Sequence, residues 1–295
     1  MIKEVWSRSY HWDDGTELLL GERTLIMGIL NITPDSFSDG GRYNAIERAV
    51  QHAEAMAAEG ADMIDIGGES TRPGSKPVPL NEELARVLPI IRAVREALPK
   101  VPISIDTYKA ETARQAMEAG AHIINDVWGL KGDANLAAVA AEYGCPVIIS
   151  HNRHKPDYND FLPDVIADLQ GSVGIAQAAG IAGDRIWLDP GIGFAKDYEQ
   201  NLQLLASLHQ LHALGYPVLL GTSRKRFIQR TLELPVDDVV EGTAATVALG
   251  IAQGCQIVRV HDVREMKRVV RMTDAVVYRQ IEGYKEGDHG WIGCN

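Results

Sequence analysis

The chain has 295 residues, 45% of them hydrophobic, and its 29 Lys and Arg against 40 Asp and Glu give a formal net charge of −11. Nucleic-acid-binding proteins usually carry a basic face, so this balance argues against a nucleic-acid partner. The polar N-terminus does not look like a signal peptide, and no stretch reaches the roughly 18 apolar residues of a membrane helix, so we expect no membrane association. Cys145, Cys255 and Cys294 lack metal-like spacing and favour a reducing compartment, and we expect a cytoplasmic protein.

Three regions are expected along the chain. Residues 1–24 carry two short apolar runs around Asp13-Asp14-Gly15, a turn sequence, and predict a β-hairpin packed on the bottom of the main fold. Residues 25–278 carry the main fold. Residues 279–295 are polar and rich in glycine, and we expect a flexible tail there.

A short apolar run, one or two polar residues and a helical stretch recur about every 30 to 40 residues from residue 25 onward. The predicted strands are 25–33, 61–67, 101–106, 121–127, 146–150, 185–189, 217–222 and 257–261. The predicted helices are 44–59, 81–98, 109–119, 133–143, 162–179, 198–214, 238–253 and 264–277. Strands that are apolar without alternation suit a parallel sheet covered on both faces.

Eight strand–helix units in one uninterrupted chain favour the α/β class and a closed (β/α)₈ TIM barrel with a short N-terminal β-hairpin. An open, doubly wound sheet is the alternative. The dinucleotide-binding version of that sheet is disfavoured, because no Gly-x-Gly-x-x-Gly follows the first strand.

Polar side chains stand at the carboxyl end of every predicted strand, and in barrels these ends form the active face. They are Asn31, Asp65, Glu69, Asp106, Asn125, Asp126, Ser150, His151, Asp189, Lys225, Arg259 and His261. One acid at a strand end is commonly a turn former or a helix cap. Eight polar ends that converge on one mouth instead favour a polar ligand, because buried polar groups need partners.

The residue types suggest two kinds of ligand. A carboxylate accepts two parallel hydrogen bonds from a ring N–H beside an amino group, so Asp106, Asn125 and Asp189 with Lys225 suit a flat heterocycle. Asn31, Arg259 and His261 form a donor-rich group that suits a phosphate.

Two further observations favour a phosphate site. Arg259 and His261 are two residues apart on one strand and therefore face the same side. Asp262-Val263-Arg264-Glu265 has the spacing that starts a helix, and a helix start after the eighth strand is a common phosphate site in barrels. The alternative is a surface arginine beside a core histidine. Asn31 and Asp35 offer oxygen ligands for Mg²⁺, which usually adds substrate phosphates and water.

Two loops on the active face, residues 33–41 and 67–75, are predicted lids, and the apolar ring of Phe37 suggests closure over a substrate. Ordinary solvated loops are the alternative. The spacing of His151 and His154 suits a helix, but the pair precedes Pro156, so a zinc site is disfavoured. The chain has no Gly-x-Ser-x-Gly elbow, and we identify no nucleophile.

Seven segments, in matching order and spacing, resemble the dihydropteroate synthase family of pterin-binding barrels. They are MGILNITPDSFSDGG (27–41), DIGGESTRPG (65–74), SIDT (104–107), IND (124–126), DPGIGF (189–194), GTSRK (221–225) and RVHDV (259–263). The resemblance covers about residues 25 to 277. It implies condensation of 6-hydroxymethyl-7,8-dihydropterin pyrophosphate with 4-aminobenzoate in folate biosynthesis, with release of pyrophosphate.

The resemblance also implies roles for residues. The residues implied for the pterin are Asp106, Asn125, Asp189 and Lys225, with Arg259 stacked near it, and Phe194 is implied as a further substrate-binding residue. Those implied for catalysis and pyrophosphate are Asn31, Asp35, Lys225, Arg259 and His261, with Mg²⁺ on Asn31 and near Asp35. Those implied for the aminobenzoate pocket, where sulfonamides compete, are Phe37, Thr71, Arg72 and Pro73. The implied mechanism is dissociative loss of pyrophosphate and attack by the arylamine, and a homodimer through the late helices is implied as well.

Two positions depart from the family pattern. Ser150 stands where a methionine precedes the histidine, and we expect its hydroxyl to alter the pterin pocket. Arg226 stands where a serine often follows the lysine, and we expect it to alter the attraction for the aminobenzoate carboxylate. Two other functions stay open: a methyltransferase that uses methyltetrahydrofolate and a corrinoid protein, and a non-catalytic pterin-binding paralogue.

Overall fold

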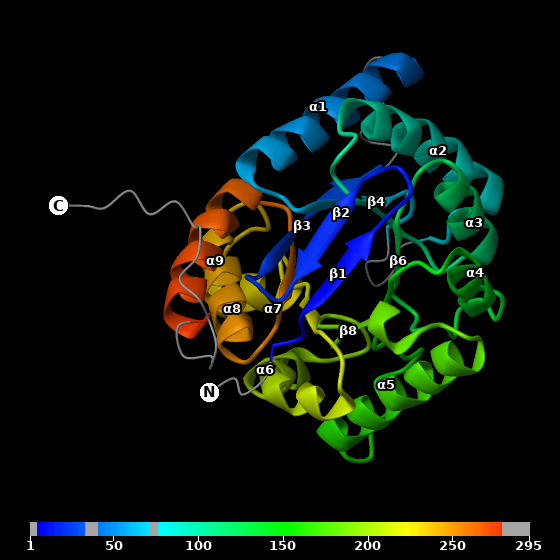
Figure 1. Ribbon diagram of the computed structural model, residues 1–295. Helices are drawn as coiled ribbons and strands as arrows, with labels where there is room; N and C mark the ends of the chain where they lie inside the picture. Colours follow the sequence, from blue (N-terminus) through cyan, green and yellow to red (C-terminus); the bar gives the residue numbers. More distant parts are fainter. Residues whose placement is uncertain (1–4, 33–40, 71–75, 279–295) are drawn as a thin grey trace.

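The computed structural model describes residues 5–32, 41–70 and 76–278 of the chain. Within these residues, eight parallel strands form a ring that the helices surround (Figure 1). Around the ring the order is β8, β7, β6, β5, β4, β3, β10, β9, and a bridge between Leu188 and Val218 joins the two ends. The predicted closed barrel is therefore confirmed, and the open sheet is excluded.

The strands lie where the apolar runs predict them, each shorter by one to four residues. They are β3 (Leu25–Asn31), β4 (Met63–Gly67), β5 (Ile103–Asp106), β6 (Ile123–Asp126), β7 (Val147–Ser150), β8 (Ile186–Asp189), β9 (Leu219–Leu220) and β10 (Ile257–Val260).

The helices are α1 (Gly41–Glu59), α2 (Leu80–Ala97), α3 (Ala110–Glu118), α4 (Leu136–Tyr143), α5 (Phe161–Ala178), α6 (Tyr198–Ala206), α7 (Arg226–Leu232), α8 (Val240–Ala252) and α9 (Val263–Val277), with short 3₁₀ helices η2 (Gly183–Arg185) and η3 (Leu208–Leu214). Two differences from the prediction stand out. The helix predicted over 198–214 divides into α6 and η3, because the backbone leaves helical geometry at Ser207. Helix α7 was not predicted, since its buried side chains are limited to Phe227 and Ile228. None of the described helices is both long and apolar enough to cross a bilayer.

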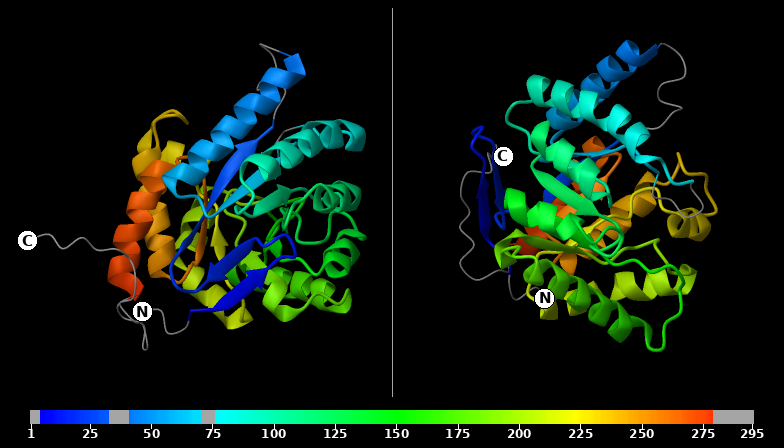
Figure 2. Two further views of the ribbon diagram at one scale, coloured as in Figure 1. Left: turned by 45° about the horizontal axis from the view of Figure 1, so that its top comes forward. Right: turned by 90° about the vertical axis from the view of Figure 1, so that its right-hand side faces the viewer.

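The N-terminal hairpin is present and closes one end of the barrel. Strands β1 (Arg8–His11) and β2 (Glu17–Leu20) pair antiparallel, with the turn at the predicted place. In Figure 1 the hairpin lies across the barrel end that faces the viewer, and Figure 2 shows the same hairpin from two other sides. Tyr10, Leu18 and Leu20 pack against side chains inside the barrel. These are Leu25, Met27, Met63, Ile123, Ile148, Trp187, Leu219 and Ile257.

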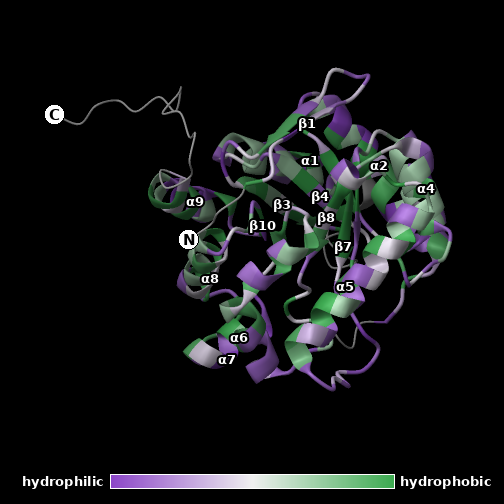
Figure 3. Ribbon diagram, turned by 60° about the horizontal axis from the view of Figure 1, so that its bottom comes forward, coloured by the Kyte–Doolittle hydropathy of each residue, from purple (hydrophilic) through white to green (hydrophobic). Residues whose placement is uncertain are grey.

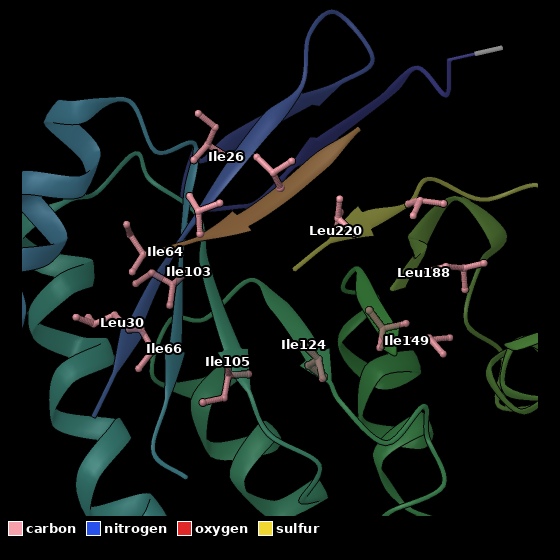
Figure 4. Packing of buried hydrophobic residues seen from close by; sticks show 14 of the residues in the cluster. Ile26, Leu30, Ile64, Ile66, Ile103, Ile105, Ile124, Ile149, Leu188 and Leu220 are labelled. Atoms are coloured by element: carbon pink, nitrogen blue, oxygen red, sulfur yellow. The ribbon is translucent and has the colours of Figure 1, made fainter. Parts of the chain in front are cut away.

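Each strand divides its side chains between the helices and the barrel interior, because successive residues of a strand point to opposite faces. The outward set packs under the helices, and Figure 4 shows members of it from Ile26 on β3 to Leu220 on β9. Strands β3, β4 and β7 are accordingly coloured as hydrophobic in Figure 3, whereas helix α5 carries both hydrophobic and hydrophilic bands. The inward set changes character along the strand: Met27 is followed by Asn31, and Trp187 by Asp189. The strands therefore deliver apolar groups to the hairpin end and polar groups to the other.

Candidate active site

A cavity of about 1220 Å³ opens at the carboxyl ends of the strands. It is lined by all of the described residues to which the family resemblance assigns a role. These are Asn31, Asp106, Asn125, Asp189, Phe194, Lys225, Arg259 and His261. The other predicted site residues, Asp35, Phe37, Thr71, Arg72 and Pro73, lie outside the described residues, as do most of both predicted lids.

Arg259 ties together two buried carboxylates at the centre of this end of the barrel. Its Nε donates to Asp65 Oδ2 at 2.6 Å, and its Nη2 donates to Asp106 Oδ2 at 2.8 Å. Asn125 Nδ2 donates to the same oxygen of Asp65 at 3.0 Å. The Arg259 side chain is 20% exposed, whereas those of Asp65 and Asp106 are 0% and 4% exposed. Burial opposes the charge of Arg259, but Asp65 and Asp106 outweigh it and raise the pKa of the guanidinium.

The pKa of Asp106 is raised to about 7. Burial is the main cause, the positive charge of Arg259 opposes it, and the neighbouring Asp65 adds to it. Asp106 Oδ1 is buried and has no hydrogen-bond partner among the described residues. Buried polar atoms are normally bonded, so this oxygen marks a position where a ligand would complete the site. Near neutral pH the carboxyl group can accept a hydrogen bond in one protonation state and donate one in the other.

Asp189, at the end of β8, and Lys225, just before α7, are two further charged groups that line the cavity. The Gly191 N–H donates to Asp189 Oδ1 at 2.7 Å, which leaves Oδ2 for a ligand. Burial raises the pKa of Asp189, and the positive charge of Lys225 opposes the rise. Lys225 Nζ donates to the Ile192 carbonyl and lies 4.7 Å from the centre of the Phe194 ring. Burial lowers the pKa of Lys225 to about 8, with Asp189 acting in the opposite direction.

His261 and Asn31 line the part of the cavity where we expect an anion to bind. His261 Nδ1 is 3.0 Å from Ser223 Oγ, and its backbone N–H donates to the same oxygen at 3.2 Å. Asn31 is exposed at the end of β3. Helix α9 begins at Val263 as predicted, but the Asp262 side chain does not cap it; its carboxylate pairs with Arg224, at 2.5 Å from Nη2.

The donor set fits a magnesium ion only in part. Asn31 offers one hard oxygen at the cavity, and Mg²⁺ commonly takes one or two protein oxygens with phosphate and water. Within residues 5–32, 41–70 and 76–278, no group of three His, Cys, Asp or Glu stands close enough to hold a metal. An ion here would therefore depend on phosphate oxygens of a substrate.

Some polar strand ends face away from the cavity. Asp126 points outward and accepts from the Trp128 and Leu130 N–H groups at 2.8 and 2.5 Å. His151 contacts Asp168 and Lys196 instead. Ser150 is buried with an unpartnered Oγ and is not among the cavity-lining residues, so the expected change to the pocket wall is not seen.

Sequence reasoning missed the pairing of Asp65 with Arg259 and the presence of Lys196 at the cavity. The first had a signal, because Asp65 stands two residues after Met63 and so shares its inward face. Lys196 had none, since it lies in a loop without periodicity.

Comparisons with known proteins agree with this geometry. A family model described as "Pterin binding enzyme" matches residues 27–261. A dihydropteroate synthase of Bacillus subtilis (strain 168) is 56% identical over 256 residues, which cover 87% of this chain and 90% of the relative. One of Clostridium beijerinckii is 53% identical and covers 89% of this chain and 98% of the relative.

Two solved structures are similar in fold as well as in sequence. The dihydropteroate synthase of Clostridium difficile, determined in the presence of pteroic acid, gives a TM-score of 0.85 at 50% identity and covers 87% of this chain and 98% of that one. The dihydropteroate synthase of Xanthomonas albilineans, determined with 4-aminobenzoic acid, gives 0.84 at 42% identity and covers 89% and 96%.

Proposed function

Because the chain belongs to the family of pterin-binding enzymes, we infer that it is a dihydropteroate synthase. It joins 6-hydroxymethyl-7,8-dihydropterin pyrophosphate to 4-aminobenzoate and releases pyrophosphate. The observation that carries this conclusion is the convergence of two buried carboxyl groups, Asp106 and Asp189, with Lys225, Arg259 and His261 on one cavity.

The pterin would lie between Asp106 and Asp189. Asp189 Oδ2 and Asp106 Oδ1 are the oxygens left for a ligand, so each carboxyl group can accept a hydrogen bond from a ring N–H or amino group on its own side of the pterin. Lys225 would donate to the ring carbonyl, and the Asn125 amide can donate or accept. Phe194 supplies an apolar face beside the Lys225 ammonium.

The reaction needs charge stabilisation and no protein nucleophile. The bond between the pterin methylene carbon and the pyrophosphate oxygen breaks, and its electron pair leaves with pyrophosphate. The arylamine lone pair then forms the new C–N bond, and the amine proton passes to pyrophosphate or water. Arg259 and His261 would stabilise the leaving anion, which is where preorganised donors contribute most to the rate. Holding both substrates in one cavity contributes the rest.

Mg²⁺ would reside on the anion side of the cavity. Asn31 is the residue of the described chain that would hold it, with Asp35 as the second predicted residue. A bound ion would neutralise part of the charge that develops on pyrophosphate.

The aminobenzoate would enter beside helix α7. Arg226 is exposed there and lines the cavity together with Phe194 and Lys225. A guanidinium at this place would attract the aminobenzoate carboxylate. Phe37, Thr71, Arg72 and Pro73 remain the predicted contributors from the two lids.

A homodimer through the late helices is part of the proposal. Leu249 on α8 is 55% exposed, and Met272 and Val276 on α9 are 66% and 52% exposed. Helices α8 and α9 also pack side by side, so these apolar side chains lie on neighbouring elements (Figure 1). The cytoplasm remains the predicted location, and the buried thiols of Cys145 and Cys255 are free, as expected in a reducing compartment.

The decisive experiment incubates the purified protein with both substrates and Mg²⁺ and measures pyrophosphate and dihydropteroate. We expect equal amounts of the two products, and neither when 4-aminobenzoate is omitted. Binding of the pterin substrate without turnover would instead identify a pterin-binding paralogue. Methyl transfer from methyltetrahydrofolate to a corrinoid protein would identify the methyltransferase.

A further inference from the structure

The loop between β8 and α6, residues 190–197, supports two of the groups assigned to the pterin. Its Gly191 N–H fixes one oxygen of Asp189, and its Ile192 carbonyl receives the Lys225 ammonium. Its Phe194 ring lies against the same ammonium. Whatever holds this loop in place therefore also sets the positions of Asp189 and Lys225.

The Lys196 side chain joins separate parts of this loop through hydrogen bonds. Its ammonium donates to the Gly191 carbonyl at 2.9 Å, to the Phe194 carbonyl at 3.0 Å and to His151 Nδ1 at 2.8 Å. An ammonium has three donors, so all three are used within the protein. Lys196 lines the cavity but offers no remaining N–H group to a substrate.

His151 connects the loop to the end of β7. Its side chain is fully buried, and its Nε2 lies 3.0 Å from Asp168 Oδ2, which also receives Arg153 Nε at 2.5 Å. Because the carboxylate can only accept, Nε2 carries the proton and Nδ1 is free to accept from Lys196. The hydrogen bond between Lys196 and His151 therefore has a defined direction.

The backbone of the two segments is also in close contact. The His151 N–H donates to the Asp189 carbonyl at 2.9 Å. A Cβ on Gly191, which has a φ of +68°, would lie 1.9 Å from the His151 carbonyl oxygen. The loop thus sits on the β7 end with no space for a side chain, and a small displacement there would move Asp189 and Lys225.

Lys196 also interacts electrostatically with the charged residues of the pterin site. Burial lowers the pKa of Lys196 to about 7, the negative charge of Asp189 opposes this, and the positive charge of Lys225 adds to it. Asp189 therefore favours the ammonium form of Lys196, which is the form that can donate all three hydrogen bonds.

We propose that Lys196 is a positioning residue for the pterin site: it fastens the 190–197 loop to His151 and so holds Asp189 and Lys225 where the ring is recognised. The proposal deepens the proposed function and rests on it. Lys196 acts through these two residues and not by touching the substrates.

The test replaces Lys196 with methionine, which keeps the length and apolar stem of the side chain and removes its donors. We expect the KM for the pterin pyrophosphate and the Kd for 6-hydroxymethylpterin to rise about tenfold, since two charged hydrogen bonds within the loop are lost. The KM for 4-aminobenzoate should stay within about twofold, because the Lys196 hydrogen bonds go to Gly191, Phe194 and His151 and not to Arg226, the described residue proposed for that substrate.

Lys267→Met is the matched control. Lys267 is also a partly buried lysine that donates to a glycine carbonyl, that of Gly60 at 3.3 Å, and it lies on the outer helix α9. The control should reproduce any general loss of stability without the change in pterin affinity. Equal losses of affinity in the two variants would overturn the proposal.

A second pair of variants keeps the test independent of whether Lys196→Met folds. His151→Asn retains an acceptor in place of Nδ1, whereas His151→Leu does not. We expect the asparagine variant to stay within about threefold of the wild-type Kd for 6-hydroxymethylpterin and the leucine variant to weaken it about tenfold. Identical Kd values for the two variants would contradict the role of the Lys196–His151 bond.

The outcomes also separate this proposal from the proposed function. If the wild-type protein binds 6-hydroxymethylpterin but forms no dihydropteroate, the proposed function fails and the Kd series still decides the role of Lys196. If turnover is normal and Lys196→Met leaves both pterin constants unchanged, the positioning role fails and the proposed function stands.

Discussion

The two ends of the barrel are built from the same eight strands but differ in the polarity of the side chains that point inward. At the hairpin end, inward side chains such as Met27 and Trp187 are apolar and fully packed by Tyr10 and its neighbours. At the other end, Asp65 and Asp106 are equally buried, yet each keeps one oxygen without a partner among the described residues. Burying unsatisfied polar atoms lowers the free energy of unfolding, and the packed apolar side chains at the hairpin end offset this loss. The retention of such atoms indicates that the carboxyl end of the barrel is the functional end.

The contrast predicts that substitutions at the mouth change activity and substitutions at the base change stability. The largest effect is expected for Arg259→Ala, because it leaves Asp65 and Asp106 without their cation and the pyrophosphate without a donor. Removing one preorganised donor to a developing anion typically costs about 10²- to 10³-fold in rate, so kcat/KM should fall by about 10³-fold when the pterin side of the site is disturbed as well.

Steady-state kinetics would measure this loss, and Arg268→Ala, an exposed arginine on α9, serves as the control. The Kd for 6-hydroxymethylpterin, which lacks pyrophosphate, should rise by less than about tenfold. Equal losses in turnover and in this Kd would remove the anion role of Arg259.

The next largest effect is expected at the base. Trp187→Ala removes a fully buried ring whose Nε1 donates to the Tyr10 hydroxyl at 2.7 Å. We expect the free energy of unfolding to fall by about 3 to 5 kcal/mol, as for other large-to-small core changes. Denaturant unfolding would measure it. The kcat/KM of the folded fraction should remain within about twofold of wild type, and a tenfold loss would show that the two ends are coupled.

A smaller effect is expected for Asp189→Asn, a substitution at the carboxyl end of the barrel. The amide oxygen keeps an acceptor for the Gly191 N–H, but the amide puts an NH₂ group, which cannot accept a hydrogen bond, in place of the Oδ2 that would receive the pterin. We expect the Kd for 6-hydroxymethylpterin to rise about 30-fold, since a hydrogen bond to a charged group contributes about 2 kcal/mol. Calorimetric titration would measure it, with the exposed Asp160→Asn as control. Wild-type affinity in Asp189→Asn would rule out this role.

The smallest effect is expected in the pH dependence of stability. Burial lowers the pKa of His151 to about 3, with Lys196 adding to the shift and Asp168 opposing it. Between about pH 6.5 and 3 the unfolded chain therefore binds a proton that the folded chain does not, so stability falls as the pH falls. His151→Asn has no proton to bind and should flatten this part of the profile in thermal unfolding. Parallel profiles for the two proteins would contradict the assignment.

The sequence revealed more about the strands than about the contacts between them. Buried runs such as ISID (103–106) and IWLD (186–189) identify both the strand and the polar residue at its end, because the pattern is local. The short α7 escaped prediction because seven residues offer too little periodicity. The bridge from Arg259 to Asp65 joins residues 194 positions apart, and only the closed barrel brings them together. The contacts of Lys196 likewise depend on the conformation of its loop, which no local sequence pattern predicts.

The most direct test of the central claim, that the carboxyl end of the barrel is a pterin site, is a crystal structure of the protein with 6-hydroxymethylpterin. We predict that the ring lies between Asp106 and Asp189, with Lys225 on its carbonyl and a ring donor on Asp106 Oδ1. A ring bound in another cavity, or a ring in this cavity that contacts neither Asp106 nor Asp189, would contradict it.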